Sequence, residues 1–236
     1  MIKNILLCTL IICAYALIVY PSEARADTQS INAPIVVELF TSQGCPACPP
    51  ADDIMNKLAT NPKVISLSYH VQYWDRPNRK DILGRAFSDD RQRRYADYSR
   101  SKRLYTPQMM VNGGAAFIGS HKEKVVEALR AAKPLEPITI TAVTGDSATL
   151  SLPQLDNGFY TLWIAGVKAK HIETNARGQS RIFTNSVLSL KTGDPWDGNA
   201  NITSVTLDKN PDIDHYIILA QNQAHGEIVA VGMLEF

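Results

Sequence analysis

Hydrophobic and polar residues follow two different patterns along the chain, and the change falls close to residue 137. Before that point, short apolar runs rich in β-branched residues alternate with longer segments in which apolar residues recur at helical spacing. The first pattern predicts buried strands and the second predicts amphipathic helices. The predicted strands are 35–40 and 64–69, the predicted helices are about 46–59, 88–103 and 120–132, and a Gly-Gly turn predicts a hairpin over 109–118. An α/β domain is therefore expected over residues 27–136.

The remaining residues, 137–236, contain several short β-type runs and no long helical period. Turn signals such as Gly145-Asp146 and Asn210-Pro211 separate these runs. Short strands at this spacing predict an all-β, sandwich-like second domain. The clearest runs are 138–143, 159–167, 181–190, 215–220 and 228–236.

Residues 1–26 are expected to be a signal peptide that lies outside both domains. An apolar run from Ile5 to Tyr20 follows Lys3, and the tripeptide Ala24-Arg25-Ala26 has the A-x-A form of a cleavage site. The run is shorter than the roughly 20 apolar residues that cross a bilayer. The mature protein is thus expected to be periplasmic or secreted, without stable membrane insertion.

The overall charge excludes one class of partner. The chain carries 24 Lys and Arg residues against 23 Asp and Glu residues, a formal net charge of +1. A nucleic-acid-binding protein usually shows a strong basic excess on one surface. No nucleic-acid partner is therefore expected.

Cleavage after Ala26 would leave Cys45 and Cys48 as the only cysteines. A disulfide across two residues closes almost no chain, so it would stabilise the fold little. At the start of a helix the pair can react instead. With Cys45 at the N-cap and Pro46 at the first helical position, the free amides of Ala47 and Cys48 would lower the pKa of the Cys45 thiol. This arrangement predicts Cys45 as the attacking thiolate and Cys48 as the resolving thiol of thiol–disulfide exchange.

The same two cysteines permit other functions. A structural zinc site would need four ligands, and the mature chain has no third cysteine and no suitably spaced histidine pair. A copper-binding protein or metallochaperone would combine both sulfurs with His70 or Met109. A third alternative is a binding module whose disulfide is only structural. No cofactor and no metal-ligand set is assigned.

Glu38 lies in the middle of the first predicted strand, seven residues before Cys45. A buried carboxylate is unfavourable unless it has a partner or a role. In disulfide exchange it would accept the proton of the Cys48 thiol. The alternative is that Glu38 points into solvent at the end of the strand.

These residues resemble the thioredoxin superfamily: a strand, Cys-Pro-Ala-Cys at the head of a helix, and a later Thr106-Pro107 before an apolar run. More narrowly, three stretches resemble a family of secreted bacterial thioredoxin-like proteins that is catalogued as domain of unknown function 1223 (DUF1223). The stretches are 38–52, 69–75 and 105–108, and a looser likeness extends through the mature chain.

The resemblance implies a cis Pro107 packed against the cysteine pair and a Thr106 backbone that binds an extended substrate strand. Without the resemblance, the sequence would not predict a cis bond between Thr106 and Pro107, because only about 5% of X–Pro bonds are cis. The residues expected to bind substrate are Thr106, Pro46, Ala47, His70 and Trp74. Two of these have a structural alternative: Trp74 could anchor the core, and His70 could be a histidine packed in the interior. Glu38 departs from the superfamily, in which the buried acid lies six residues before the first cysteine.

The sequence therefore predicts an α/β thioredoxin-like domain over 27–136, with a helical insertion at about 71–104, followed by an all-β sandwich-like domain over 137–236. The predicted function is that of a periplasmic or secreted thiol–disulfide oxidoreductase. Its expected partners are protein thiols and disulfides or a redox partner protein. The expected catalytic residues are Cys45, Cys48, Pro107 and Glu38.

Overall fold

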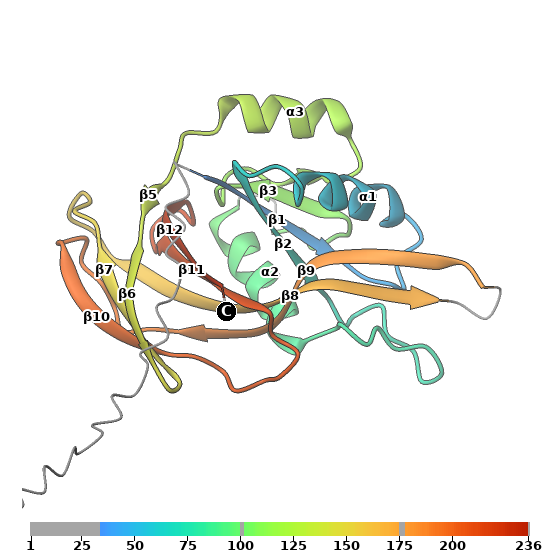
Figure 1. Cartoon of the computed structure of the whole chain (residues 1–236). Helices are drawn as coiled ribbons and strands as arrows, with labels where there is room; N and C mark the ends of the chain where they lie inside the picture. Colours follow the sequence, from blue (N-terminus) through green and yellow to red (C-terminus); the bar gives the residue numbers. More distant parts are fainter. Residues whose placement is uncertain (1–33, 100–101, 175–177, 236) are drawn as a thin grey trace, which may run out of the picture.

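The computed structural model describes residues 34–99, 102–174 and 178–235 and consists mainly of β-structure (Figure 1). The expected signal peptide lies outside these residues. The helices are α1 (Pro49–Leu58), α2 (Ala86–Tyr98) and α3 (Lys122–Ala131). The strands are β1 (Ile35–Thr41), β2 (Val64–His70), β3 (Gln108–Val111), β4 (Phe117–Ile118), β5 (Glu136–Pro137), β6 (Thr139–Thr144), β7 (Ser147–Leu152), β8 (Tyr160–Thr174), β9 (Ser180–Thr192), β10 (Asn201–Thr206), β11 (His215–Asn222) and β12 (Ile228–Glu235). No helix in the described ranges has the length and apolarity needed to cross a membrane.

Nine strands form one mixed sheet in the order β4-β3-β1-β2-β9-β8-β11-β12-β5. The expectation of an α/β thioredoxin-like domain followed by an all-β sandwich-like domain is therefore wrong. Strands from before and after residue 137 share this sheet, because β2 pairs with β9 in parallel at Ser68 and Ser186. An exposed strand edge offers unpaired N–H and C=O groups, and pairing two such edges satisfies both. Local apolar patterns do not show which edges will pair.

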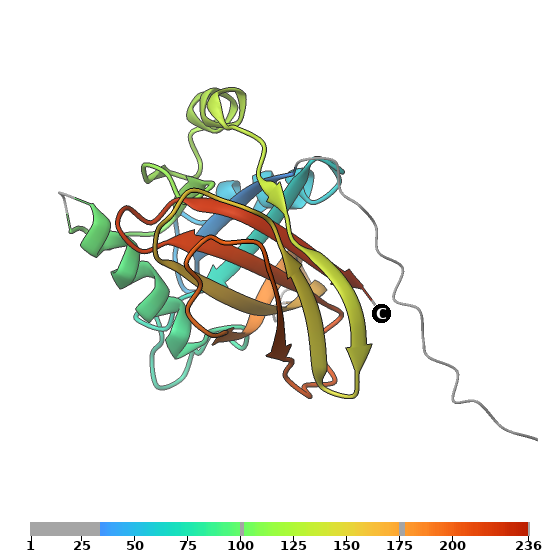
Figure 2. The ribbon, with the colours of Figure 1, turned by 90° about the vertical axis from the view of Figure 1, so that its left-hand side faces the viewer.

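Strand β11 shows why the centre of the sheet is buried on both faces. Side chains alternate across a strand, so Tyr216, Ile218 and Ala220 point to one face and Ile217 and Leu219 to the other. The first set packs against the separate three-stranded sheet β10-β7-β6, and the second set packs with residues of β1 and β2. Figure 2 shows the three-stranded sheet folded across β11 and β12.

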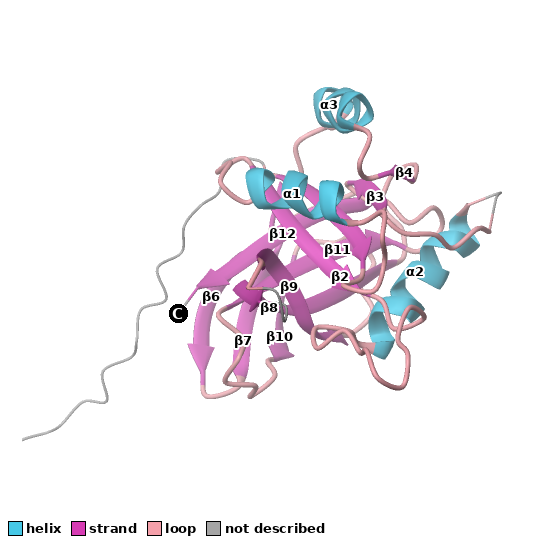
Figure 3. Ribbon diagram, turned by 90° about the vertical axis from the view of Figure 1, so that its right-hand side faces the viewer, coloured by secondary structure: helices cyan, strands magenta, loops and turns pink. Residues whose placement is uncertain are grey.

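The helices cover the part of the sheet formed by β1, β2 and β3 (Figures 1 and 3). Val37 and Leu39 of β1 pack against Ile54 and Met55 of α1 and Val125 of α3. The opposite face of β1 carries Val36, Glu38 and Phe40. It packs toward α2 and the C-terminal strands through a second core that includes Tyr95 and Trp163. The cysteine-bearing corner therefore rests on residues from the whole chain.

Most predicted elements exist, but several differ in extent. Helix α1 begins at Pro49, three residues later than expected, and α2 ends at Tyr98. Strand β8 was predicted to end at residue 167 and continues to Thr174. Strand β9 was predicted to begin at residue 181 and begins at Ser180, and the two strands pair as far as Thr174 and Ser180. The extra length forms a projecting arm, defined here as residues 168–174 and 178–186, that reaches α1 (Figure 1).

Candidate functional site

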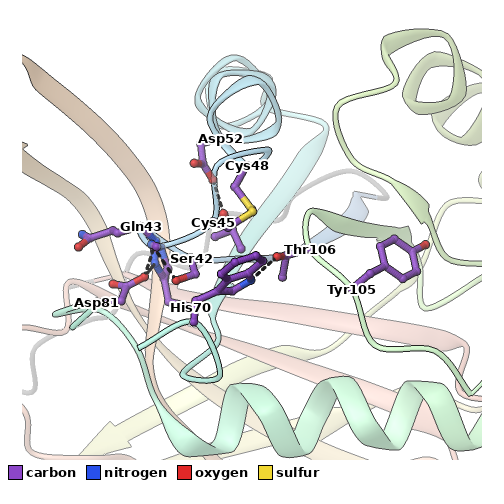
Figure 4. The surroundings of a disulfide bond; sticks show 12 residues. Ser42, Gln43, Cys45, Cys48, Asp52, His70, Asp81, Tyr105 and Thr106 are labelled. Atoms are coloured by element: carbon purple, nitrogen blue, oxygen red, sulfur yellow. Dashed lines mark hydrogen bonds and ion pairs between the residues drawn. A yellow bond between two sulfur atoms is a disulfide. The ribbon is translucent and has the colours of Figure 1, made fainter. Parts of the chain in front are cut away.

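Cys45 and Cys48 form a disulfide in the loop between β1 and α1 (Figure 4). Two successive turns shape this loop: the Cys45 amide donates to the Ser42 carbonyl at 3.1 Å, and the Cys48 amide donates to the Cys45 carbonyl at 3.4 Å. Cys45 is 2% exposed and Cys48 is 0% exposed. Pro46 and Ala47, by contrast, are exposed at the tip of the loop.

The expected helix start at Cys45 is wrong, because the N-cap residue is Cys48. Pro49 and Pro50 occupy the first two helical positions, where a missing N–H is tolerated. The next two amides, of Ala51 and Asp52, both donate to the Cys48 carbonyl. Of the two amides that were expected to stabilise a Cys45 thiolate, that of Cys48 donates to the Cys45 carbonyl instead.

Asp52 is a site residue to which sequence reasoning assigned no role. It lies one helical turn beyond Cys48, and residues four apart share a helix face. Figure 4 shows its carboxyl beside the Cys48 side chain. The Thr41 hydroxyl donates to Oδ1 at 2.7 Å and the Arg181 guanidinium donates to Oδ2 at 2.5 Å. The signal for this residue is its spacing of four positions from the second cysteine.

Burial gives Asp52 an unusual acidity. The residue is 5% exposed, and this desolvation raises the pKa of its carboxyl to about 6. The Thr41 hydrogen bond and the charges of His70 and Arg181 oppose the rise without cancelling it. A carboxyl with such a pKa gains and loses its proton close to neutral pH, as a general acid or base must.

His70, at the end of β2, is fully buried and is linked to the cysteine loop through Asp81. Its Nδ1 lies 2.8 Å from Oδ2 of Asp81, which also accepts from the Gln43 amide at 2.8 Å. Burial alone would raise the pKa of Asp81, but the bonds to His70, Gln43 and Leu83 outweigh it and the pKa lies below the usual value. His70 Nε2 is buried without a hydrogen-bond partner among the described residues. His70 is thus placed to position the loop, and the structure does not present it to an incoming substrate.

Trp74 and Thr106 border the loop on another side. The indole Nε1 of Trp74 donates to the Thr106 hydroxyl at 2.7 Å, and the Thr106–Pro107 peptide bond is cis, as the resemblance implied. Trp74 also packs on Gly44, where an added Cβ would lie 3.0 Å from the Trp74 Cβ and 3.2 Å from its carbonyl oxygen. Half-buried Trp74 therefore contacts the loop and the proline segment together.

The register of β1 and β3 places Pro107 at the same end of the sheet as the disulfide. Phe40 pairs with Gln108, so Pro107, which immediately precedes β3, lies at the level of Thr41, where the chain leaves β1 and enters the cysteine loop. The structure therefore brings the loop of Cys45, Pro46, Ala47 and Cys48 close to Trp74 and to the Thr106–Pro107 bond.

Glu38 is not brought to this corner. It shares a face of β1 with Val36 and Phe40, whereas α1 covers the opposite face. Its carboxylate accepts from Nε of Arg91 at 2.7 Å and from the hydroxyl of Tyr95. Glu38 is buried, so the alternative of a solvent-exposed side chain is wrong, and the expected role in proton transfer from Cys48 has no contact to support it.

The described ranges contain no group of three or more His, Cys, Asp or Glu residues placed to hold a metal ion. The side chains considered as a third copper ligand are engaged elsewhere. His70 pairs with Asp81, and Met109 packs in the core beneath α1. The chemistry available at this corner is that of the disulfide and the buried Asp52 carboxyl.

Comparison with known proteins gives a family and a fold. A family model described as "Protein of unknown function (DUF1223)" matches residues 36–221. The crystal structure of protein AGR_C_4864 from Agrobacterium tumefaciens is similar, with 28% identity and a TM-score of 0.74 over 85% of this chain and 93% of that chain. HBP35 of Porphyromonas gingivalis shares the fold alone, with 16% identity and a TM-score of 0.55 over 86% of this chain and 75% of that chain. No curated protein matches the sequence.

Proposed function

Since the chain belongs to the DUF1223 family of proteins of unknown function, we propose from its own site that it is a thiol–disulfide oxidoreductase that acts through Cys45 and Cys48. The observation that carries the proposal is the pairing of this disulfide with a buried carboxyl, Asp52, one helical turn away. A bridge that spans two residues adds little stability, so a structural role accounts poorly for it. The resemblance to the thioredoxin superfamily supports the proposal only at this corner, through the strand, the Cys-x-x-Cys loop and cis Pro107.

The exchange uses each sulfur in a different role. A substrate thiolate attacks Sγ of Cys45, a sulfur–sulfur bond to the substrate forms, and Cys48 leaves as a thiolate. A second substrate thiolate then attacks the substrate sulfur, which releases Cys45 and oxidises the substrate pair to a disulfide. The protein disulfide is thereby reduced to a dithiol, and the reverse sequence oxidises it.

Asp52 supplies the proton transfer in this scheme. In the reverse direction, the Cys48 thiol attacks the mixed disulfide on Cys45 and gives its proton to the Asp52 carboxylate. In the forward direction, the protonated carboxyl returns it to the leaving thiolate. Because the pKa of Asp52 is about 6, both forms are accessible near neutral pH. Trp74, Thr106 and the exposed Pro46–Ala47 tip border the disulfide and form the surface that a protein substrate would meet.

The proposed compartment is outside the cytoplasm. The apolar run 5–20 and the Ala24-Arg25-Ala26 tripeptide support export, and disulfides persist in oxidising compartments. Intact-mass measurement of the exported protein is expected to give a chain that begins at Asp27. A mass that includes residues 1–26 would contradict cleavage at this site.

The decisive experiment measures the reduction potential of the chain from residue 27. The protein is equilibrated against glutathione buffers and its thiols are trapped. A reversible two-electron transition is expected, at about −200 mV or higher for a donor of disulfides and near −270 mV for a reductase. A pair that stays oxidised in every accessible buffer would overturn the proposal.

Matched single-cysteine variants test the two roles. Cys48→Ser is expected to accumulate a mixed disulfide between Cys45 and a model protein thiol, because the resolving sulfur is gone. Cys45→Ser is the control and should accumulate far less, since the proposed scheme gives Cys48 only the resolving step. Equal trapping by both variants would contradict the assignment of Cys45 as the exchanging sulfur.

A further inference from the structure

The projecting arm lies along the face of α1 that continues from Cys48 (Figure 1). Asp52 and Asn56 follow Cys48 at intervals of four residues, so the three side chains share this face. The Thr184 hydroxyl of the arm donates to Oδ1 of Asn56 at 3.0 Å, and the Arg181 guanidinium donates to Oδ2 of Asp52 at 2.5 Å. The arm therefore contacts α1 at the two turns that follow the second cysteine.

The groups that act on the Asp52 carboxyl come from four elements. Thr41, at the end of β1, donates to Oδ1, and Arg181 of the arm donates to Oδ2. The charges of His70, at the end of β2, and of Asp53, on α1 itself, act on the same carboxyl. Of these charged groups, Arg181 is the one in an ion pair with Asp52.

The arm also holds the Arg181 guanidinium in place. The guanidinium carbon lies 4.9 Å from the ring centre of Phe183, which is buried and packs edge-on against the His70 ring at 5.3 Å. Glu173 is the charged neighbour opposite Arg181 in the β8–β9 register. A buried aromatic ring on one side and an ion pair on the other thus fix the direction of the Arg181 side chain toward Asp52.

Among the described residues, two ion pairs join an arginine to a buried carboxylate, and they differ in the exposure of the cation. In the pair of Arg91 with Glu38, both side chains are at most 1% exposed. In the pair of Arg181 with Asp52, the arginine side chain is 36% exposed. A buried ion that loses its partner is strongly unfavourable. Arg181 can reach water when Asp52 takes up a proton, so a change of charge at Asp52 leaves no cation stranded in the core.

We propose that Arg181 is a positioning residue for the exchange, which holds the Asp52 carboxylate in place beside Cys48 and sets how readily it takes the Cys48 proton. The inference rests on the proposed function of the cysteine pair. In the resolving step the proton passes from the Cys48 thiol to the Asp52 carboxylate. The Cys48 thiolate forms the bond to Sγ of Cys45, and the substrate sulfur leaves as a thiolate with the electron pair of the broken bond. Asp52 then releases its proton to water, and the ion pair with Arg181 forms again.

The pH profile of mixed-disulfide resolution tests the charge of Arg181. In Arg181→Gln the inflection is expected to move up by about one pH unit, because an adjacent opposite charge favours the ionised carboxylate. The pKa of Asp52 is about 6, so the rate near pH 6 is expected to fall about fivefold, while the rate above about pH 8 changes less than about twofold. Rapid mixing of the reduced protein with a peptide disulfide that has a chromophoric leaving thiol separates the attack from the resolution. An inflection that stays in place would overturn the inference.

Three variants separate the charge of Arg181 from the docking of the arm. Arg181→Lys keeps the charge and is expected to restore most of the rate near pH 6. Thr184→Val removes a hydrogen bond between the arm and α1 without any change of charge, so its inflection should stay in place. Arg130→Gln makes the same change of charge at an exposed position of α3 and should also leave the inflection in place. A shift in Thr184→Val as large as that in Arg181→Gln would assign the effect to docking and overturn the inference.

A titration of Asp52 itself distinguishes this inference from the proposed function. Carbon-13 NMR of the oxidised protein follows the Asp52 carboxyl, identified by the signal that is lost in Asp52→Asn, and needs no exchange chemistry. Its midpoint is expected to rise by about one pH unit in Arg181→Gln. An unmoved midpoint would overturn the inference while the exchange activity of the unaltered protein stands. A raised midpoint in a protein that exchanges no disulfide would overturn the proposed function and, with it, the role of Arg181 in exchange.

Discussion

Glu38 of β1 and Arg91 of α2, 53 positions apart in the sequence, form an ion pair of 2.7 Å whose side chains are at most 1% exposed. The Arg91 guanidinium also lies 5.0–5.3 Å from the ring centres of Tyr69, Tyr95 and Trp163. The pair therefore joins α2, the N-terminal strands and β8 within one core.

Removal of one member of this ion pair should lower the stability of the fold. Arg91→Ala is expected to lower the free energy of unfolding by about 3–5 kcal/mol, because it leaves the Glu38 carboxylate buried without a cation. Urea unfolding measures the change. The control is Arg93→Ala, which removes an exposed pair with Asp90 and should cost less than about 1 kcal/mol. A loss of similar size in both variants would refute the importance of the buried pair.

Asp52, and not Glu38, should set the pH dependence of exchange. In Asp52→Asn the rate of mixed-disulfide resolution is expected to fall roughly 10²-fold and to lose its inflection near pH 6. Glu38→Gln should keep the inflection, because Glu38 lies on the opposite face of β1. Asp53→Asn changes the adjacent, exposed carboxylate and serves as the matched control. An inflection that survives in Asp52→Asn would assign the proton acceptor elsewhere.

The same carboxyl should make stability fall as pH rises. The pKa of Asp52 is 3.8 in the unfolded reference and about 6 in the folded protein, so between these values the folded state holds a proton that the unfolded state has lost. The linked loss of unfolding free energy between about pH 4 and pH 7 is roughly 3 kcal/mol at 1.36 kcal/mol per pKa unit. Unfolding curves of the unaltered protein and Asp52→Asn, subtracted at each pH, isolate this contribution. A difference that is constant over this range would contradict the raised pKa.

The hydrogen bond between Trp74 and Thr106 can be removed by a substitution that keeps the shape of the Thr106 side chain. Thr106→Val deletes the acceptor of the indole N–H and should cost about 1 kcal/mol. Thr106→Ser retains the hydroxyl and should lose little of that amount. Chemical unfolding gives the energies. Destabilisation by Ser with none by Val would show that the methyl group, and not the hydrogen bond, matters.

The N-terminal segment should not fold alone. A chain of residues 27–137 lacks β8 and β9, so the apolar face of β1 and β2 and the open edge of β2 would meet water. We expect weak near-ultraviolet circular dichroism, non-cooperative unfolding and strong binding of a hydrophobic dye. Cooperative unfolding of this fragment would show that the shared sheet is not needed for its fold.

The individual strands were predictable because their signals are local. The apolar runs 35–40 and 215–220 arise from neighbouring residues, and the structure places strands at both. The part of β8 beyond residue 167 was missed because Lys168, Lys170 and Glu173 interrupt the apolar pattern that marks a strand, whereas its partner in the arm lies within the predicted run 181–190.

The site was only partly predictable because its contacts are long-range. Cys45 and Cys48 are three positions apart in the sequence, and the pairing followed from their spacing. Asp52, by contrast, owes its burial and its ion pair to Arg181, 129 positions away. No local pattern reports such a partner, and the start of α1 was misplaced because Pro46 and Pro49 are equally suited to a first helical position.

The parallel pairing of β2 with β9 also bears on the order in which the molecule matures. Pairing between strands so distant in the chain forms slowly, because a long loop must close first. The Cys45–Cys48 loop has two intervening residues and can close long before that. Where an oxidant acts before β2 and β9 pair, the disulfide is therefore expected to form while both sulfurs are still exposed, so that the fold closes over an already oxidised pair.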